Sequence, residues 1–391
     1  MVKKIIVKKI MSDEEIESRE GEYFKEKYYK QPGCRIMKED CDVYTTDGRC
    51  LLKLRRKVIP KKLTDLAIES YLSASKKKHE NRGAAAGVLD RNKLAGYIGE
   101  FIKPNKFRTS FKSKVTGVKS DQYVSNMSKS NIIGFYDQQD KRNNKDPNPI
   151  PCRLTVFNRD HGDLWKKAIP FLQACNLQFK KLMPKEHKYQ YDRARLTPKY
   201  TIPKTAFSTV TINYSWRTAL HKDKGDYHDG FGNLVVVEDP NNLNSYEGCY
   251  LGFPQYGVCA DARTGDFLAM NVHEWHCNTE FRKPKGQKVT KHNFSDRDII
   301  NDWHYNRMSM VMYLRENMIQ CASKSKIKSN KKLLAKNNNR KKKSPTKPKR
   351  KSPTKNKRKN KSPIKNKGKK KSPTKSKRKS PTKKKKTIKK Q

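Results

Sequence analysis

The sequence predicts an α+β protein: a β-rich core of the jelly-roll kind with flanking helices, followed by a disordered basic tail. Three observations lead to this prediction. Short strand-like runs separated by turn residues fill residues 205–314, amphipathic helical patterns precede them, and acidic residues are absent from position 321 onward. Many short strands with no helix between them are typical of barrels and sandwiches.

Charge divides the chain into unlike parts. Of its 391 residues, 91 are Lys or Arg and 38 are Asp or Glu, which gives a formal net charge of +53. Residues 321–391 hold 34 of the basic residues and no acidic one. Such a segment buries too little apolar surface to offset its ordering entropy, so we expect disorder there. The predicted organisation is an N-terminal region of unclear function (1–130), a folded domain (131–320) and the tail (321–391).

Several protein classes are excluded by composition. No apolar run is long enough for a transmembrane helix, and residues 1–11 lack the apolar core of a secretory signal. The nine cysteines show no Cys-x2–4-Cys pair for zinc and no disulfide framework, so we expect reduced thiols. We therefore predict an intracellular protein, neither secreted nor bound to a membrane. Its positive charge indicates a polyanionic partner, with nucleic acid as the default.

The first 160 residues give a mixed pattern. Leu63, Leu66 and Tyr71 form an apolar stripe that predicts a helix over 61–75, and a loop over 76–83 follows. The spacing of apolar residues predicts a second helix over 87–106. Strands are expected at 133–136 and 153–157.

The rest of the predicted domain begins with a helix and continues in strands. An apolar face predicts a helix over 163–175, which Pro170 should disturb. The strand candidates that follow are residues 205–213, 233–238, 249–253, 257–263, 266–272 and 307–314.

A histidine and a carboxylate two residues apart suggest a metal centre. His221 and Asp223 point to the same side of an extended segment, so both can bind one ion. A second histidine would complete a two-His, one-carboxylate face, which leaves positions open for substrate and O2 in non-haem Fe(II) oxygenases. Two candidates, His273 and His276, are three residues apart, so one strand cannot direct both inward.

A strand near the end of the domain offers an anion site. Arg307 and Ser309 share one face of a period-2 strand. A guanidinium can bind a carboxylate through two hydrogen bonds, and the hydroxyl adds one more. An oxygenase that uses 2-oxoglutarate needs such a cation for the far carboxylate.

Plainer explanations compete with these. A His-x-Asp pair alone is common as ordinary surface polarity, and only the later histidine and the Arg-x-Ser strand, in this order, favour a site. Asp226 is either a partner that orients a ligand or a turn residue. Cys277 should point away from the site and serve packing.

The motifs in this half of the chain resemble a known family. The stretches 205–213 (TAFSTVTIN) and 217–226 (RTALHKDKGD) are similar to the oxygenase domain of the base J-binding proteins, thymine dioxygenases of the TET/JBP branch of Fe(II)/2-oxoglutarate enzymes. Residues 134–137 (GFYD), 276–279 (HCNT) and 307–315 (RMSMVMYLR) resemble further family segments in the same order. The similarity covers about residues 132–317.

The resemblance implies a fold, a reaction and a set of roles. The core would be a double-stranded β-helix. His221, Asp223 and His276 would be the catalytic Fe(II) ligands, which favours His276 over His273. Arg307 and Ser309 would bind the co-substrate 2-oxoglutarate, and the C–H bond attacked would be in the 5-methyl group of thymine or 5-methylcytosine, on a base taken out of the duplex. An algal branch of the family uses ascorbate, and the sequence leaves that co-substrate open.

Two segments depart from the family. The stretch between His276 and Arg307 is longer and carries a basic run over 282–292, which we expect to affect substrate access. No J-binding module is recognisable, and the chain ends instead in Ser-Pro-Thr-Lys repeats at residues 344, 352, 372 and 380. These repeats resemble linker-histone tails. We predict that the tail binds DNA without sequence preference, through counterion release, in the nucleus or another DNA-containing compartment.

Two other functions stay open at this point. The same chemistry would serve an oxygenase of protein or RNA, and an inactive fold would leave a histone-like DNA-binding protein. The complete set of metal ligands favours an enzyme over the inactive alternative.

Overall fold

The computed structural model describes most of the chain ahead of the basic tail. The described residues are 2–94, 99–102, 104–113, 116–117, 123–137, 152–285, 299–300, 303–304 and 306–322. Residues 1–336 form one compact unit. The tail beyond residue 322, where disorder was predicted, and residues 286–292 of the basic run over 282–292 lie outside the described residues. None of the described helices has the length and apolar character needed to cross a membrane.

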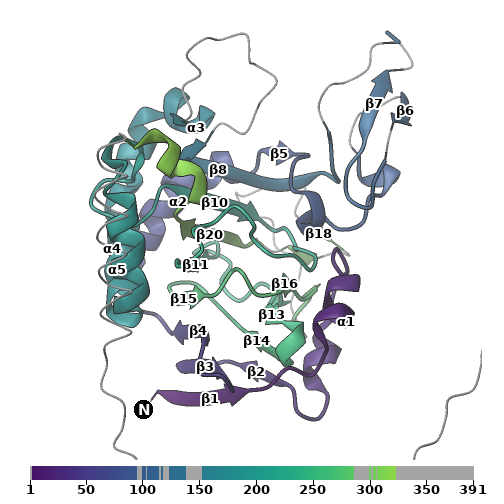
Figure 1. The fold of residues 1–391 in the computed structure, drawn as a ribbon, viewed down its shortest axis with the longest axis vertical. Helices are drawn as coiled ribbons and strands as arrows, with labels where there is room; N and C mark the ends of the chain where they lie inside the picture. Colours follow the sequence, from purple (N-terminus) through teal and green to yellow (C-terminus); the bar gives the residue numbers. More distant parts are fainter. Residues whose placement is uncertain are drawn as a thin grey trace, which may run out of the picture. The chain divides into compact units, whose positions relative to one another are not determined.

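A large, mostly antiparallel sheet forms the centre of this unit (Figure 1). Ten described strands belong to it, in the order β1-β3-β4-β15-β11-β20-β10-β8-β5, with β9 paired to β8. Their bounds are Lys3–Val7 (β1), Cys41–Thr45 (β3), Cys50–Arg55 (β4), Lys78–His79 (β5), Ser128–Asp137 (β8), Cys152–Leu154 (β9), Thr209–Tyr214 (β10), Gly232–Val237 (β11), Phe267–Met270 (β15) and Met308–Tyr313 (β20).

A smaller sheet faces it. Its order is β16-β13-β14-β2, with bounds Cys277–Asn278 (β16), Leu251–Phe253 (β13), Val258–Ala260 (β14) and Arg35–Met37 (β2). The remaining strands form pairs: Gly99–Ile102 (β6) with Ser110–Ser113 (β7), Glu247–Gly248 (β12) with Phe281–Arg282 (β17), and Ile299–Ile300 (β18) with Trp303–His304 (β19).

Helices cover the outer face of the large sheet. They are Lys61–Ser75 (α2), Val156–Asp160 (α3), Gly162–Leu182 (α4) and Pro184–Ala194 (α5), while Asp13–Ser18 (α1) lies on another side of the unit (Figure 1). Short 3-10 turns connect elements at Glu26–Lys30 (η1), Gly83–Ala86 (η2), Arg91–Lys93 (η3), Pro198–Tyr200 (η5), Pro254–Tyr256 (η6) and Glu316–Cys321 (η8).

Strand β11 shows why the core has two layers. All six of its residues are buried. Val235 and Val237 pack with the helices, whereas Leu234 and Val236 pack between the two sheets. A strand buried on both faces reads as a continuous apolar run instead of an alternating one.

The first 130 residues are part of the same architecture. Strands β1, β3 and β4 extend the large sheet beyond β15, and β2 extends the small sheet beyond β14. Helix α2 packs beside α4 in the outer core. The predicted boundary at residue 130 therefore does not separate two compact units.

The mixed helix and strand content agrees with the α+β prediction, and α2 spans the predicted residues 61–75. Helix α4 continues through Pro170 to Leu182, seven residues beyond the predicted end. The strands predicted from 205 to 314 correspond to β10, β11, β13, β14, β15 and β20.

Three predictions were wrong. The helix expected over 87–106 is replaced by η3 and strand β6, because Gly87 takes a left-handed φ of 85° and Phe101 and Ile102 favour strands. The strand expected over 153–157 ends at Leu154, and Thr155 is the N-cap residue of α3. Cys152 and Cys321 form a disulfide instead of two thiols, with their Cα atoms 6.1 Å apart; the other seven cysteines are free.

Candidate metal centre and cavity

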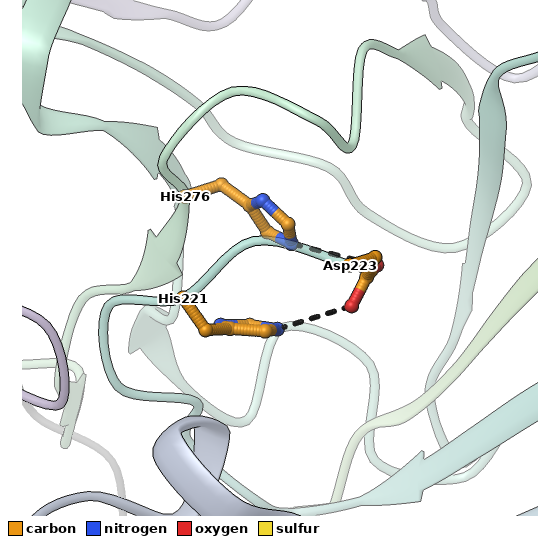
Figure 2. A group of neighbouring side chains, drawn as sticks. All are labelled: His221, Asp223 and His276. Carbon is orange, nitrogen blue, oxygen red and sulfur yellow. Dashed lines mark ion pairs between the residues drawn. The ribbon is translucent and has the colours of Figure 1, made fainter. Parts of the chain in front are cut away.

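The two histidines and the carboxylate come together at one point (Figure 2). Ligand atoms of His221, Asp223 and His276 lie within 4.8 Å of one another. The Nε2 atoms of His221 and His276 are 3.5 and 3.7 Å from the two Asp223 oxygens. Among the described residues this is the group with the geometry of a metal site.

Backbone pairing sets this geometry. His221 and His276 face each other in an antiparallel bridge, with both N–H···O distances at 3.0 Å. The Asp223 N–H donates to the Val272 carbonyl at 3.0 Å. The centroids of the two imidazole rings consequently lie 4.4 Å apart.

Hydrogen bonds also fix which nitrogen each imidazole presents. The Nδ1 atom of His221 lies 2.7 Å from the Ala219 carbonyl, and that of His276 lies 2.9 Å from the Glu274 carbonyl. A carbonyl only accepts, so each Nδ1 carries the proton and each Nε2 keeps its lone pair. Such outer contacts orient metal-binding imidazoles. Burial, with a further contribution from His276, lowers the pKa of His221 to about 4, which keeps that ring neutral.

His273 lies apart from this group. Its Nε2 is 3.1 Å from the Tyr227 carbonyl, and its ring stacks on His228. Between the two histidines that the sequence left open, the structure brings His276 to the centre. Cys277 is fully buried near Tyr29 and packs as predicted.

A cavity of about 590 Å³ opens beside the three residues. Strand β20 lines it with Ser309, Val311 and Tyr313, and Arg307 lies just before that strand. Asn213, on the neighbouring strand β10, pairs with Ser309 and also lines the cavity. The alternate residues of β20, Met308, Met310 and Met312, belong to the outer core. Successive side chains of the strand therefore point in turn to the cavity and to the core.

Arg307 has the features of an anion site. Only 3% of the residue is exposed, and its Nε has no hydrogen-bond partner among the described residues. A buried guanidinium N–H without a partner is costly, and a bound carboxylate would satisfy it. Ser309, also 3% exposed, lies on the same cavity wall.

The other end of the same wall holds a second arginine, which is paired. Arg315 donates through Nε to Asp137 on β8, and this contact outweighs burial and holds the pKa of Asp137 below its usual value. Asp226 pairs with Arg315 through an antiparallel backbone β-bridge, and its side-chain Oδ2 is enclosed without a partner among the described residues. Burial, and then the charge of Asp223, raises the pKa of Asp226 well above its usual range. Asp226 is thus a cavity residue rather than an ordinary turn residue.

The opposite wall comes from the segment before the predicted domain. Asn81, Arg82, Asn105, Phe107 and Arg108 all line the cavity. Sequence reasoning missed these residues because they lie in polar loops without periodicity. Only the folded contacts bring them to the site: the Ala219 N–H, two residues before His221, donates to the Ala85 carbonyl at 2.9 Å.

The donor set fits the centre of a non-haem iron oxygenase. Two imidazoles and one carboxylate on one side of an ion leave the remaining positions free, and a buried arginine stands ready for a dicarboxylate.

Comparison with known proteins agrees with this class. Residues 132–316 match the Tet_JBP family, described as the oxygenase domain of the 2OGFeDO superfamily. This segment, slightly less than half of the chain, is similar to the oxygenase domains of the TET/JBP family. This family implies Fe(II) and 2-oxoglutarate as metal and co-substrate, which the residues of the cavity suit.

Curated relatives share this part of the chain. Thymine dioxygenase JBP1 of Trypanosoma brucei brucei is 29% identical over 238 residues, which are 60% of this chain and 24% of the relative. The bifunctional helicase and thymine dioxygenase JBP2 of Trypanosoma cruzi is 31% identical over 192 residues, 48% of this chain and 15% of the relative. The chain thus spans a quarter or less of these relatives. A solved structure of NgTET1 in complex with 5mC DNA covers 82% of this chain and 100% of its own, with a TM-score of 0.41 and 12% identity.

Proposed function

We propose that the protein oxidises the 5-methyl group of thymine or 5-methylcytosine in DNA. The observation that carries the proposal is the convergence of two imidazole Nε2 atoms and one carboxylate beside a cavity, inside a segment that matches the TET/JBP oxygenase domain. The relatives named as thymine dioxygenases support the substrate class.

In this proposal the two facing sheets form a double-stranded β-helix. The order β15-β11-β20-β10 supplies one half and β16-β13-β14 most of the other. His221, Asp223 and His276 hold the Fe(II) ion. Arg307 and Ser309 bind the far carboxylate of 2-oxoglutarate, and the Nε of Arg307 thereby gains the partner that it lacks.

The bound ion supplies activation of O2, coupled to decarboxylation of 2-oxoglutarate. The net reaction consumes one O2, one 2-oxoglutarate and one methyl group, and yields succinate, CO2 and a hydroxymethyl group. One oxygen atom enters succinate and the other the base. The residues of this chain would present two Nε2 atoms to the ion, fix the dicarboxylate and enclose the reacting methyl group.

The tail is proposed to tether the enzyme to DNA. Its excess of positive charge would release counterions from the duplex, and tethering would raise the local concentration of substrate. Such a substrate places the protein in the nucleus or in another compartment that contains DNA.

Mass spectrometry of nucleosides tests the proposed function. The full-length protein is incubated with Fe(II), 2-oxoglutarate and duplex DNA that contains thymine and 5-methylcytosine, with and without ascorbate. We expect a +16 Da product on one of the two bases. An ascorbate-derived adduct would point to the algal reaction, and consumption of 2-oxoglutarate without any modified base would contradict DNA as the substrate.

A further inference from the structure

Side-chain hydrogen bonds hold the part of the cavity wall that residues 81–88 form. The Ser125 hydroxyl accepts the N–H groups of Arg82 and Gly83, each at 3.1 Å. The Asn126 side chain donates to the carbonyls of Ala86 and Val88 at 2.9 and 2.8 Å. The backbone that carries Arg82 is therefore fixed before any ligand arrives.

The Arg82 side chain enters the cavity without a partner. Its Nε is enclosed and makes no hydrogen bond, and no ion pair neutralises the guanidinium within the described part of the chain. Burial lowers the pKa of Arg82. The residue as a whole is half-buried. An enclosed guanidinium N–H without an acceptor is costly, so this position suits a ligand that brings negative charge.

Arg82 lies toward the end of the cavity away from Arg307. It is within electrostatic reach of Tyr313, Asp223 and Arg315. Tyr313 is six residues beyond Arg307 along β20, a distance of roughly 20 Å at about 3.3 Å per residue. A five-carbon dicarboxylate that is bound to Arg307 is too short to reach the Tyr313 end as well.

A second cation and an aromatic ring accompany Arg82. The guanidinium of Arg108 lies against Gly83, where an added Cβ would be 2.9 Å from its Nη2 atom, and Arg108 is exposed. Phe107, half-buried, lines the same wall. Two guanidinium groups beside an aromatic ring suit a nucleotide, since the cations can bind phosphate oxygens and the ring can stack on a base.

We propose that Arg82 is a substrate-positioning residue that binds the DNA backbone phosphate next to the target nucleotide, with Arg108 as the outer cation of the same phosphate subsite. The proposal deepens the proposed function and rests on it for the choice of DNA as ligand. A phosphate held at a rigid wall would set how far the base enters the cavity, because phosphate contacts fix register.

The test uses the full-length protein and short duplexes in which one phosphate near the target base is replaced by an uncharged methylphosphonate. Affinities are measured by fluorescence anisotropy without 2-oxoglutarate, so that no turnover occurs. At one position next to the target we expect the wild type to bind the neutral duplex about tenfold more weakly. In Arg82→Gln this ratio should fall to about one. The tail contributes equally to both duplexes and cancels in the ratio.

Two variants serve as controls. Arg82→Lys keeps a point charge and should restore part of the ratio. Arg195→Gln removes an exposed arginine at the end of α5, outside the cavity lining, and should keep the wild-type ratio.

A wild-type affinity ratio in Arg82→Gln would overturn the proposal. If the KM of that variant for 2-oxoglutarate also rises, Arg82 serves the co-substrate. If its melting temperature falls instead, Arg82 has a structural role. An enzyme that modifies no base but keeps the phosphate dependence would refute the proposed function alone.

Discussion

The cavity has two sides that come from different parts of the chain and are held in different ways. On one side, His221, His276 and Arg307 lie on or next to paired strands of the family-matched segment. On the other, Arg82 and Arg108 lie in loops before that segment. Strand pairing positions the first set of side chains. Hydrogen bonds of the Ser125 and Asn126 side chains with backbone groups position the opposite wall. If the proposed roles hold, we expect mutations to separate the reaction from substrate contact.

The largest effect is expected at the metal centre. His221→Ala removes one of three ligands, so turnover should fall below detection while salt-dependent DNA binding persists. Product formation and anisotropy are measured in parallel. His273→Ala is the matched control, because His273 lies outside the cavity, and it should retain activity. Loss of DNA binding in His221→Ala would contradict the separation of the two sides.

A smaller effect is expected at the anion site. Arg307→Gln removes a buried guanidinium, and the KM for 2-oxoglutarate should rise about 100-fold. The affinity for DNA should stay unchanged, since Arg307 lies at the other end of the cavity from Arg82. Steady-state kinetics with each substrate varied in turn tests this. A raised KM for DNA with an unaltered KM for 2-oxoglutarate would reverse the assignment of the two ends.

Disrupting the clamp on the opposite wall should act only there. Ser125→Ala leaves the N–H groups of Arg82 and Gly83 without an acceptor and should lower the free energy of unfolding by about 1–2 kcal/mol. Binding of a short duplex should weaken several-fold, while the KM for 2-oxoglutarate stays constant. Chemical denaturation and anisotropy measure the two effects, and a change in the KM for 2-oxoglutarate would show that the two sides are coupled.

The smallest expected effect is a gain in stability. Asp226 is enclosed with one oxygen unpartnered and its pKa raised, so its ionisation in the folded state costs free energy. Asp226→Asn should raise the free energy of unfolding by about 1 kcal/mol at pH 7 in metal-free protein. The gain should vanish below about pH 4, where the carboxyl is protonated in both states. An equal gain at both pH values would mean that charge is not the cause.

The sequence singled out the residues on one side of the cavity because their signals are local. The His-x-Asp spacing, the later His276 and the Arg-x-Ser strand are short patterns with chemical meaning, and the structure brings all five residues to one cavity. Without the family resemblance the sequence could not distinguish His273 from His276. The turn that separates them depends on a long-range backbone hydrogen bond, from the Asp223 N–H to the Val272 carbonyl.

The opposite wall was beyond sequence reasoning for a physical reason. Arg82 lies in a polar run that reads as an ordinary loop, and its position depends on Ser125, more than forty residues later. The helix expected over 87–106 failed because apolar spacing alone ignored Gly87 and the strand preference of Phe101. Long-range contacts, not local pattern, decide such segments.

The central claim is that this cavity couples the oxidation of 2-oxoglutarate to the hydroxylation of a methyl group on a DNA base. The most direct test quantifies succinate and 5-hydroxymethyl pyrimidine in the same initial-rate reaction, with His221→Ala as the blank. We predict equal amounts of the two products from the wild type and neither from the variant. Succinate formed without any oxidised base, on DNA that carries both thymine and 5-methylcytosine, would contradict the account.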